Sequence, residues 1–229
     1  MPSHVRRAVA EFVGTFGFVF FGAGVVVANS FGGAGFGLLG IALVHAIALA
    51  VMISATMAIS GGHLNPAVTI GFLVTRRLDG RNAAIYIVAQ LLGATLGALA
   101  VKGLLPASAV RAAAVGTPLI AGTVTMAQAI MLEALLTFFL VSVVFGTCVN
   151  PDAPKIGGFG IGLVLFFDIM VGGPLTGAAM NPARAFGPAV ASGIWTAHAV
   201  YWIGPVIGAV LAALLWDKVL LPKRVQSTE

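Results

Sequence analysis

The stretch GGHLNPAVTIG, from Gly61 to Gly71, has a close relative later in the chain, GAAMNPARAFG, from Gly177 to Gly187. Each contains Asn-Pro-Ala, follows glycine and precedes an apolar run. Asn is favoured at the N-cap of a helix, and Pro suits the first helical position, where the missing N–H has no partner to lose. Each stretch therefore predicts the start of a short helix, at Pro66 and at Pro182.

The composition is that of a membrane protein. Hydrophobic residues make up 59% of the chain, charged residues only 8%, and the mean hydropathy is +1.07. A soluble domain carries about 25% charged residues, so this chain could not cover a surface that faces water. The net charge of +5 lies at the ends of apolar segments, so no nucleic-acid partner is expected. The single Cys148 excludes an intramolecular disulfide and a cysteine metal cluster, and no metal or cofactor is expected.

Six apolar segments are long enough to cross about 30 Å of hydrocarbon, which takes roughly 20 helical residues. They cover residues 8–28, 36–59, 83–104, 125–149, 157–175 and 197–221. An even number of spans places both termini on one side of the membrane. That side holds most of the basic residues, which predicts that both termini are cytoplasmic. The basic residues are Arg6, Arg7, Arg76, Arg77, Arg81, Lys155, Lys218, Lys223 and Arg224, against Lys102 and Arg111 on the other side.

The chain also contains an internal repeat. EFVGTF at Glu11 matches EALLTF at Glu133, and YIVAQLLGA at Tyr86 matches YWIGPVIGA at Tyr201. Each half reads span, span, Asn-Pro-Ala segment, span, and three spans per half give the halves opposite orientations. The sequence therefore predicts one channel domain over residues 1–229, built as an inverted repeat of about 6–105 and 125–221. Such repeats are associated with transport pathways at the bilayer midplane.

The Asn-Pro-Ala segments are too short to cross a bilayer. From Asn65 to Arg76 a helix would rise roughly 16 Å, about half the membrane, so each segment is predicted to be a re-entrant loop with a half-helix. Gly61-Gly62 and Gly172-Gly173 are expected to open these loops. Irregular backbone at that depth must be buried in protein or line a water-filled cavity. Two opposed helix N-termini would repel a cation, and the Asn amides could donate to a passing oxygen. The predicted pore centre is Asn65, Pro66, Ala67, Asn181, Pro182 and Ala183.

Three acids within apolar segments and one histidine need an explanation. Glu11 and Glu133 could be proton-relay acids, but their symmetric placement favours acceptance of hydrogen bonds from the N–H groups of the re-entrant loops. His63 is expected to support the first of these loops. Asp168 lies in an apolar run and needs a partner or water.

With these motifs the chain resembles the aquaporin (major intrinsic protein) family along its whole length. The resemblance implies an all-α membrane protein in which six transmembrane helices and two re-entrant half-helices surround a narrow pore. It also implies a homotetramer with one pore per subunit, in the cell membrane. The implied function is passive water transport that excludes protons and ions, without enzymatic activity.

The family's second constriction is formed by four positions, which fall here on His45, Ile169, Ala178 and Arg184. The set resembles that of plant tonoplast intrinsic proteins and ammonia-permeable aquaporins, so ammonia and hydrogen peroxide are further candidate solutes. Some plant members have an additional His in the third connection. Here that stretch, AVGTPLIAG, contains none, which counts against ammonia.

Three alternatives fit the residues less well. A glycerol facilitator of the same family usually has Asp after the Arg of the second motif, whereas this chain has Ala185, and the aromatic pair Tyr201-Trp202 is typical of water-type members. An ion-coupled transporter needs acidic groups at its broken helices, but these segments offer Asn and Arg. An enzyme would need a nucleophile–base pair or metal cluster, which four His and one Cys do not provide.

Overall fold

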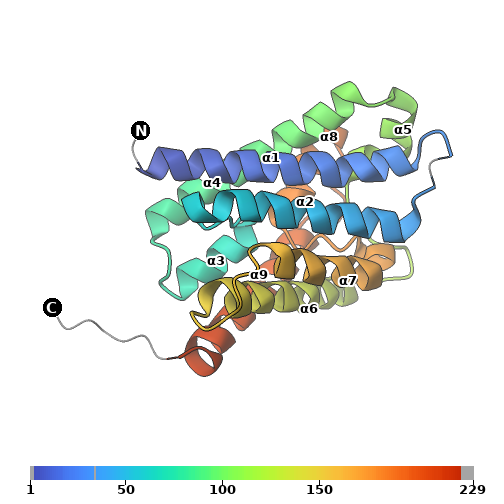
Figure 1. Ribbon diagram of the computed structural model, residues 1–229. Coiled ribbons are helices and arrows are strands. Elements are labelled where there is room, and N and C mark those ends of the chain that lie inside the picture. Colours follow the sequence, from blue (N-terminus) through green and yellow to red (C-terminus); the bar gives the residue numbers. More distant parts are fainter. Residues whose placement is uncertain (1–2, 34, 223–229) are drawn as a thin grey trace.

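The computed structural model describes residues 3–33 and 35–222, which contain helices and no strand (Figure 1). The first half consists of α1 (Ser3–Asn29), α2 (Gly37–Ser60), α3 (Pro66–Val74) and α4 (Gly80–Leu104). The connection holds α5 (Ala107–Ala112) and the 3₁₀ turn η1 (Ala114–Gly116). The second half consists of α6 (Met126–Val144), η2 (Phe145–Val149), α7 (Phe159–Thr176), α8 (Pro182–Ser192), α9 (Val200–Leu215) and η3 (Trp216–Leu220).

Six of the described helical segments are long and apolar enough to cross a membrane. They are Ser3–Asn29, Gly37–Ser60, Gly80–Leu104, Met126–Val149, Phe159–Thr176 and Val200–Leu220. All six predicted spans are confirmed with small shifts of their ends. The largest shift is at the first span, whose helix includes the basic turn before residue 8.

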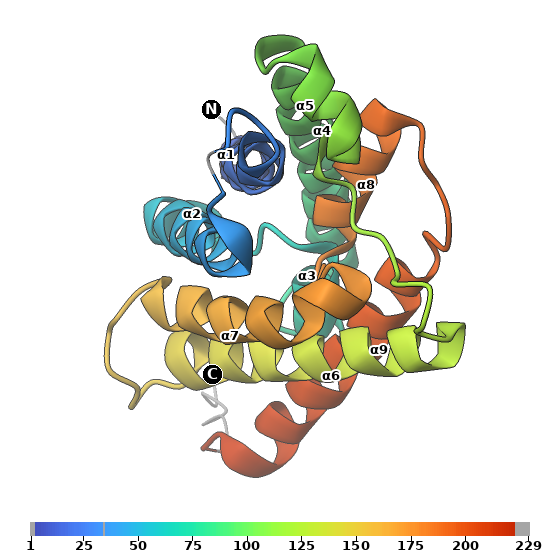
Figure 2. The same cartoon turned by 90° about the vertical axis from the view of Figure 1, so that its right-hand side faces the viewer.

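The two halves run in opposite directions. In Figure 1, α1 and α6 point to opposite ends of the bundle, and the short helices α3 and α8 lie toward opposite ends. Figure 2, turned by 90°, shows the long helices surrounding the interior that the loops before α3 and α8 enter. The closest helix pairs are α1 with α4 and α6 with α9, the equivalent pairs of the two halves.

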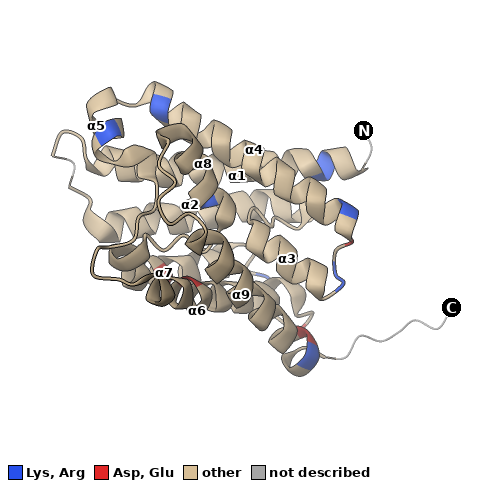
Figure 3. Cartoon of the chain, turned by 180° about the vertical axis from the view of Figure 1, so that it is seen from behind, with Lys and Arg blue, Asp and Glu red and all other residues tan. Residues whose placement is uncertain are grey.

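Apart from the buried Arg184 of α8, the described basic residues lie toward the two ends of the bundle (Figure 3). We call the end where α1 begins and η3 ends the basic end, and the opposite end, which carries α5, the α5 end. The basic end holds more of the described Lys and Arg, in agreement with the predicted asymmetry. Lys223 and Arg224, which belong to that prediction, lie outside the described residues.

Glycines allow the closest helix pairs to approach each other. A methyl group at Gly93 or Gly97 of α4 would overlap the backbone of α1. One at Gly204 or Gly208 of α9 would overlap the backbone of α6 in the same way. Small residues four apart are a common means of packing helices in membranes, where contact of backbones replaces a hydrophobic driving force.

The re-entrant loops begin at equivalent glycines. Gly61 (φ 95°) ends α2 and Gly177 (φ 81°) ends α7, each in the left-handed conformation that glycine adopts without strain. The prediction that Gly172 and Gly173 open the second loop is wrong, because both continue α7. The helix ends at the same distance before each motif Asn, so Gly177, and not Gly172, is the equivalent of Gly61.

Candidate pore

The two motif asparagines begin the half-helices as predicted. Asn65 is the N-cap of α3, and its Oδ1 accepts the N–H of Ala67 at 2.8 Å. Asn181 is the N-cap of α8, and its Oδ1 accepts the N–H groups of Ala183 at 3.0 Å and Arg184 at 3.3 Å. The predicted caps are confirmed, and both helices turn their N-termini toward the centre of the molecule.

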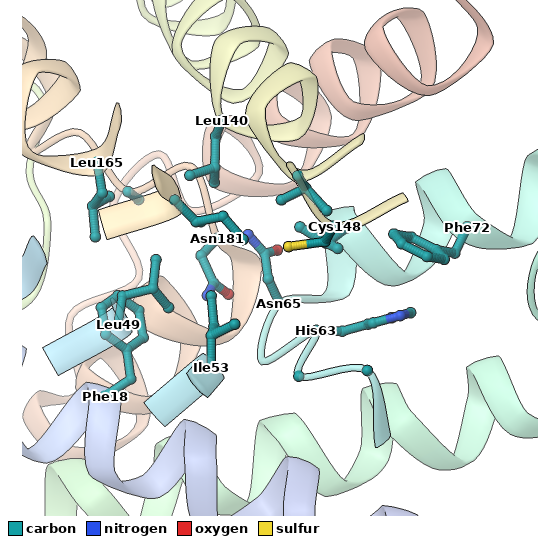
Figure 4. A pocket seen from close by; sticks show the side chains of 16 residues that line it. Phe18, Leu49, Ile53, His63, Asn65, Phe72, Leu140, Cys148, Leu165 and Asn181 are labelled. Carbon is teal, nitrogen blue, oxygen red and sulfur yellow. The ribbon is translucent and has the colours of Figure 1, made fainter. Parts of the chain in front are cut away.

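Each asparagine is also bonded to the loop of the other half. Asn65 Nδ2 donates to the carbonyl oxygen of Met180 at 2.9 Å, and Asn181 Nδ2 donates to that of Leu64 at 2.9 Å. Leu64 (φ 48°) and Met180 (φ 50°) both adopt the left-handed conformation, which costs energy for residues other than glycine. An amide nitrogen carries two hydrogens, so each asparagine keeps a second N–H. Figure 4 shows the two side chains next to each other.

A buried glutamate holds the first re-entrant loop. Glu11, which is 0% exposed, accepts hydrogen bonds from the N–H groups of His63 at 3.0 Å and Leu64 at 2.7 Å. The hydroxyl of Ser60 and the amide of Gln90 also donate to it, at 2.6 and 2.8 Å. These bonds satisfy loop N–H groups that have no helical partner.

Glu133 does the same in the second half. It is 0% exposed and accepts the N–H groups of Ala179 at 3.0 Å and Met180 at 2.7 Å, with the hydroxyl of Thr176 at 2.7 Å. The contacts of both glutamates are those expected from their symmetric placement in the sequence. With their oxygens engaged by loop N–H groups, these acids have a structural explanation that needs no proton relay.

A narrow cavity of about 30 Å³, which we call the central cavity, borders the two asparagines (Figure 4). It extends toward the basic end as far as Phe72 of α3 and Cys148 of η2. Its wall is apolar apart from groups of the first re-entrant loop, the two asparagines and Cys148. By volume it holds about two water molecules. It is lined by Phe18, Leu49, Ile53, Gly61, Gly62, His63, Asn65, Val68, Phe72, Leu140, Val144, Cys148, Ile161, Leu165, Ala179 and Asn181.

A second cavity, of about 210 Å³, lies toward the α5 end and is called the Arg184 cavity. Nη1 of Arg184 donates to the carbonyl oxygen of Gly116 at 3.0 Å, and Nη2 lies 3.3 Å from Nε2 of His45. Nδ1 of His45 lies 2.9 Å from the carbonyl oxygen of Ile41. With the Nδ1 proton donated to Ile41, Nε2 accepts from Arg184. Arg184 Nε has no hydrogen-bond partner among the described residues.

Three of the four predicted filter residues meet at this cavity. His45, Ile169 and Arg184 line it, although they come from α2, α7 and α8. The fourth, Ala178, is not among the residues that line the cavity, whereas its neighbour Gly177 is. Ala178 has φ 44°, and its methyl group lies toward Gly172 of α7. On this side the cavity is therefore bordered by Gly177 and not by Ala178.

The sequence predicted that His63 supports the first re-entrant loop but not that it also lines a cavity. Its ring contacts Phe72, with 4.3 Å between centroids, and Nδ1 lies 3.2 Å from Oγ1 of Thr69. Gln90 donates to that same Oγ1 at 3.0 Å. His63 thus supports the loop, as expected, and also lines the central cavity. Sequence reasoning missed Gln90. The alignment of the two halves could have indicated it, because a polar Gln90 in the first half corresponds to Pro205 in the second.

Asp168 remains separate from both cavities. It is 2% exposed, and its Oδ2 has no hydrogen-bond partner among the described residues. It lines neither the central cavity nor the Arg184 cavity. The structure gives no reason for a carboxyl group at this position.

Two opposed half-helices that meet at a narrow cavity inside spanning helices define a membrane channel with re-entrant loops. Residues 1–216 match the family profile described as major intrinsic protein. The chain therefore belongs to the major intrinsic protein family.

Known relatives agree with this assignment over most of their length. The chain is 44% identical over 221 residues to "Aquaporin TIP4-4" of Zea mays, covering 93% of this chain and 86% of the relative. It is 42% identical to "Aquaporin TIP1-2" of Zea mays, covering 97% and 89%. The X-ray structure of the aquaglyceroporin from Plasmodium falciparum superimposes with a TM-score of 0.84 at 26% identity, covering 94% of this chain and 96% of that one. The predicted aquaporin-like fold is confirmed.

Proposed function

We propose that this protein is a passive channel for water that excludes protons and ions. The observation that carries the proposal is the central cavity, where the amides of Asn65 and Asn181 border a wall made mostly of apolar side chains. A water molecule there can accept hydrogen bonds from the amides but finds few partners on the opposite side. The relatives called aquaporins, up to 44% identical, support the same function.

Exclusion of cations follows from the charges around the path. The N-termini of α3 and α8 both point to the asparagines, and the positive ends of two helix dipoles raise the energy of a cation there. Arg184 adds a fixed positive charge at the second cavity. We propose that His45, Ile169, Ala178 and Arg184 form the selectivity filter, in which Gly177, the neighbour of Ala178, borders the cavity.

Ammonia is the second candidate solute. The observation in its favour is Ile169, an apolar residue that lines the Arg184 cavity together with His45 and Arg184. A filter with one apolar side can pass a solute that accepts few hydrogen bonds. Hydrogen peroxide is a further candidate solute, and its permeability is measured in the same vesicles. Glycerol is disfavoured by Ala185 after the filter Arg, and the similarity to an aquaglyceroporin is an agreement of fold at 26% identity.

The assembly and the orientation are part of the proposal. Six spanning helices support an integral membrane protein, which we place in the cell membrane as a homotetramer of single-domain subunits with both termini in the cytoplasm. A reporter that is active only outside the cytoplasm, fused after Glu229, should be silent. An active reporter would reverse the orientation. Crosslinking of the purified protein should give species of up to four subunits.

The function is tested by stopped-flow measurements on proteoliposomes. Vesicles with the protein should shrink in an osmotic gradient faster than protein-free vesicles, without a proton current. Separate gradients of glycerol and ammonia then rank the solutes. Water flux equal to that of protein-free vesicles would overturn the proposal, and a larger flux of glycerol than of water would favour the facilitator.

A further inference from the structure

A line of contacts joins an ion pair at the basic end to the wall of the central cavity. The guanidinium of Arg77 lies over the ring of Phe145, 5.7 Å from its centroid. The ring of Phe145 contacts that of Phe72 at 5.2 Å, and Phe72 contacts His63 at 4.3 Å. Phe72 and His63 both line the central cavity, as Figure 4 shows.

Arg77 is held in this position from two directions. Its Nε and Nη2 donate to Oδ1 of Asp217 at 3.0 and 2.8 Å, and the side chains are 20% and 7% exposed. Its backbone N–H donates to the carbonyl oxygen of Phe72 at 2.9 Å. A planar guanidinium that is paired and stacked at once has one orientation available, which a lysine could not reproduce.

Asp217 is itself fixed to the helix that carries Phe145. Its neighbour Trp216 packs against Gly146, where a methyl group would lie 2.8 Å from the indole. The end of the last spanning helix therefore contacts the same turn, η2, whose first residue lies beneath Arg77. Phe145 is 0% exposed and is enclosed by these groups.

Of the two phenylalanine rings in this line, Phe72 borders the central cavity and Phe145 does not. The ring of Phe72 is held by His63 on one side and by Phe145 on the other. Because protein interiors are close-packed, a ring released from Phe145 would turn toward the unfilled volume, which is the cavity. A cavity of about 30 Å³ would be largely closed by part of a phenyl ring.

We propose that Arg77 and Asp217 are positioning residues that keep the pore open at the basic end, by holding Phe145 and through it Phe72 away from the path. The inference rests on the proposed water channel and adds a role for residues outside the pore. It applies to the rate of permeation, because neither residue lines the central cavity.

The test compares single and double variants in the same vesicles. Arg77→Ala should lower water permeability per protein molecule about threefold, which corresponds to the loss of one cation–π contact. Phe72→Ala should raise permeability, since it removes the ring. In Arg77→Ala/Phe72→Ala the permeability should equal that of Phe72→Ala, because no ring remains to enter the path. Arg76→Gly removes an adjacent, exposed positive charge and should leave permeability unchanged.

Asp217→Asn provides a second way to weaken the line if Arg77→Ala yields little folded protein. It keeps Arg77 and should lower permeability in the same direction by a smaller factor. Thermal unfolding of each variant in detergent shows that it is folded before the fluxes are compared. A folded Arg77→Ala or Asp217→Asn protein as permeable as the wild type would overturn the inference alone. So would a double variant that falls threefold below Phe72→Ala. A wild type no more permeable than protein-free vesicles would instead overturn the proposed function and the inference with it.

Discussion

The two halves of the molecule hold their re-entrant loops alike but surround them with different side chains. Glu11 and Glu133 accept equivalent loop N–H groups, and Tyr86 and Tyr201 donate to equivalent carbonyl oxygens, of Ser60 and Thr176, at 2.7 and 2.8 Å. At three positions around this shared frame, the first half has polar side chains where the second has small or apolar ones. The polar residues of the first half are His63, Thr69 and Gln90. The equivalent positions of the second half hold Ala179, Ala185 and Pro205, respectively.

The third residue after each motif Asn shows how different side chains on the same backbone change the path. It is Val68 in the first half and Arg184 in the second. Val68 lines the central cavity and Arg184 lines the other. A symmetric backbone therefore produces an asymmetric path, with a valine at this position near one end and a charged arginine near the other. The frame sets where the two half-helices meet, and single side chains set what each end of the path admits.

The largest expected effect concerns the shared frame. Glu133→Gln places an amide NH₂ against a loop N–H and should destabilise the protein by about 1–3 kcal/mol. Glu11→Gln should cost less, because Oε1 of Gln90 has no partner among the described residues and can accept the new amide after a flip. Unfolding midpoints in detergent measure the difference. Adding Gln90→Leu to Glu11→Gln should make the destabilisation as large as that of Glu133→Gln. Equal destabilisation by Glu11→Gln and Glu133→Gln alone would contradict this explanation.

The next effect is on the charged end of the path. Arg184→Val gives the second half the residue of the first and removes the donors at the Arg184 cavity. Permeability to glycerol should rise about tenfold, because valine is much shorter than arginine and widens the constriction; a tenfold rise corresponds to a barrier lower by about 1.4 kcal/mol. Proton current should also become measurable. Arg111→Gln, an exposed cation at the same end, is the control and should change neither.

A smaller effect is expected from exchanging the walls of the filter. His45→Phe with Ile169→His moves the imidazole across the cavity but does not remove it. Ammonia flux should therefore fall more than water flux, with a change in their ratio of about threefold, or ~0.6 kcal/mol. Stopped-flow measurements of both solutes decide the matter. Equal losses, or a wild type that passes no ammonia, would leave water as the solute.

The smallest effect concerns how the half-helices end. After α8 the chain turns at Gly193 (φ 80°), but after α3 it turns at Arg76 (φ 54°), where a side chain is unfavourable. Arg76→Gly should stabilise the protein by about 0.5 kcal/mol, the difference between the relieved strain and the greater flexibility of glycine in the unfolded chain. Arg81→Gly, inside α4, should destabilise it. An unfolding midpoint of Arg76→Gly below that of the wild type would contradict the claim that the backbone is strained at Arg76.

Most of the frame could be predicted because its signals are local or repeated. Asn and Pro at the start of each half-helix act within one helical turn. The equivalent roles of Glu11 and Glu133 follow from their equivalent positions in the repeat. Features that depend on distant segments were not predicted. The carbonyl of Gly116 that accepts from Arg184 lies in a turn without a sequence signal, and Arg77 pairs with Asp217 from 140 residues away.

The two glycine pairs show a different kind of error. Gly172-Gly173 resembles Gly61-Gly62 as a pattern, but glycine is also tolerated inside a membrane helix, where it allows close packing. Only the register relative to the motif Asn separates these roles. The position of Ala178 escaped prediction for a related reason, since its left-handed backbone determines where the methyl group points.

The reciprocal bonds between the motifs also have a consequence for synthesis. Asn65 donates to Met180, which follows it by 115 residues, so its acceptor does not yet exist when the first half leaves the ribosome. At about 5–20 residues per second, the first loop remains incomplete for roughly 6–23 s. During that interval its Asn amide and the carbonyl oxygen of Leu64 need temporary partners, such as water or the translocation machinery. The first half of the pore is therefore completed only when the second half arrives in the bilayer.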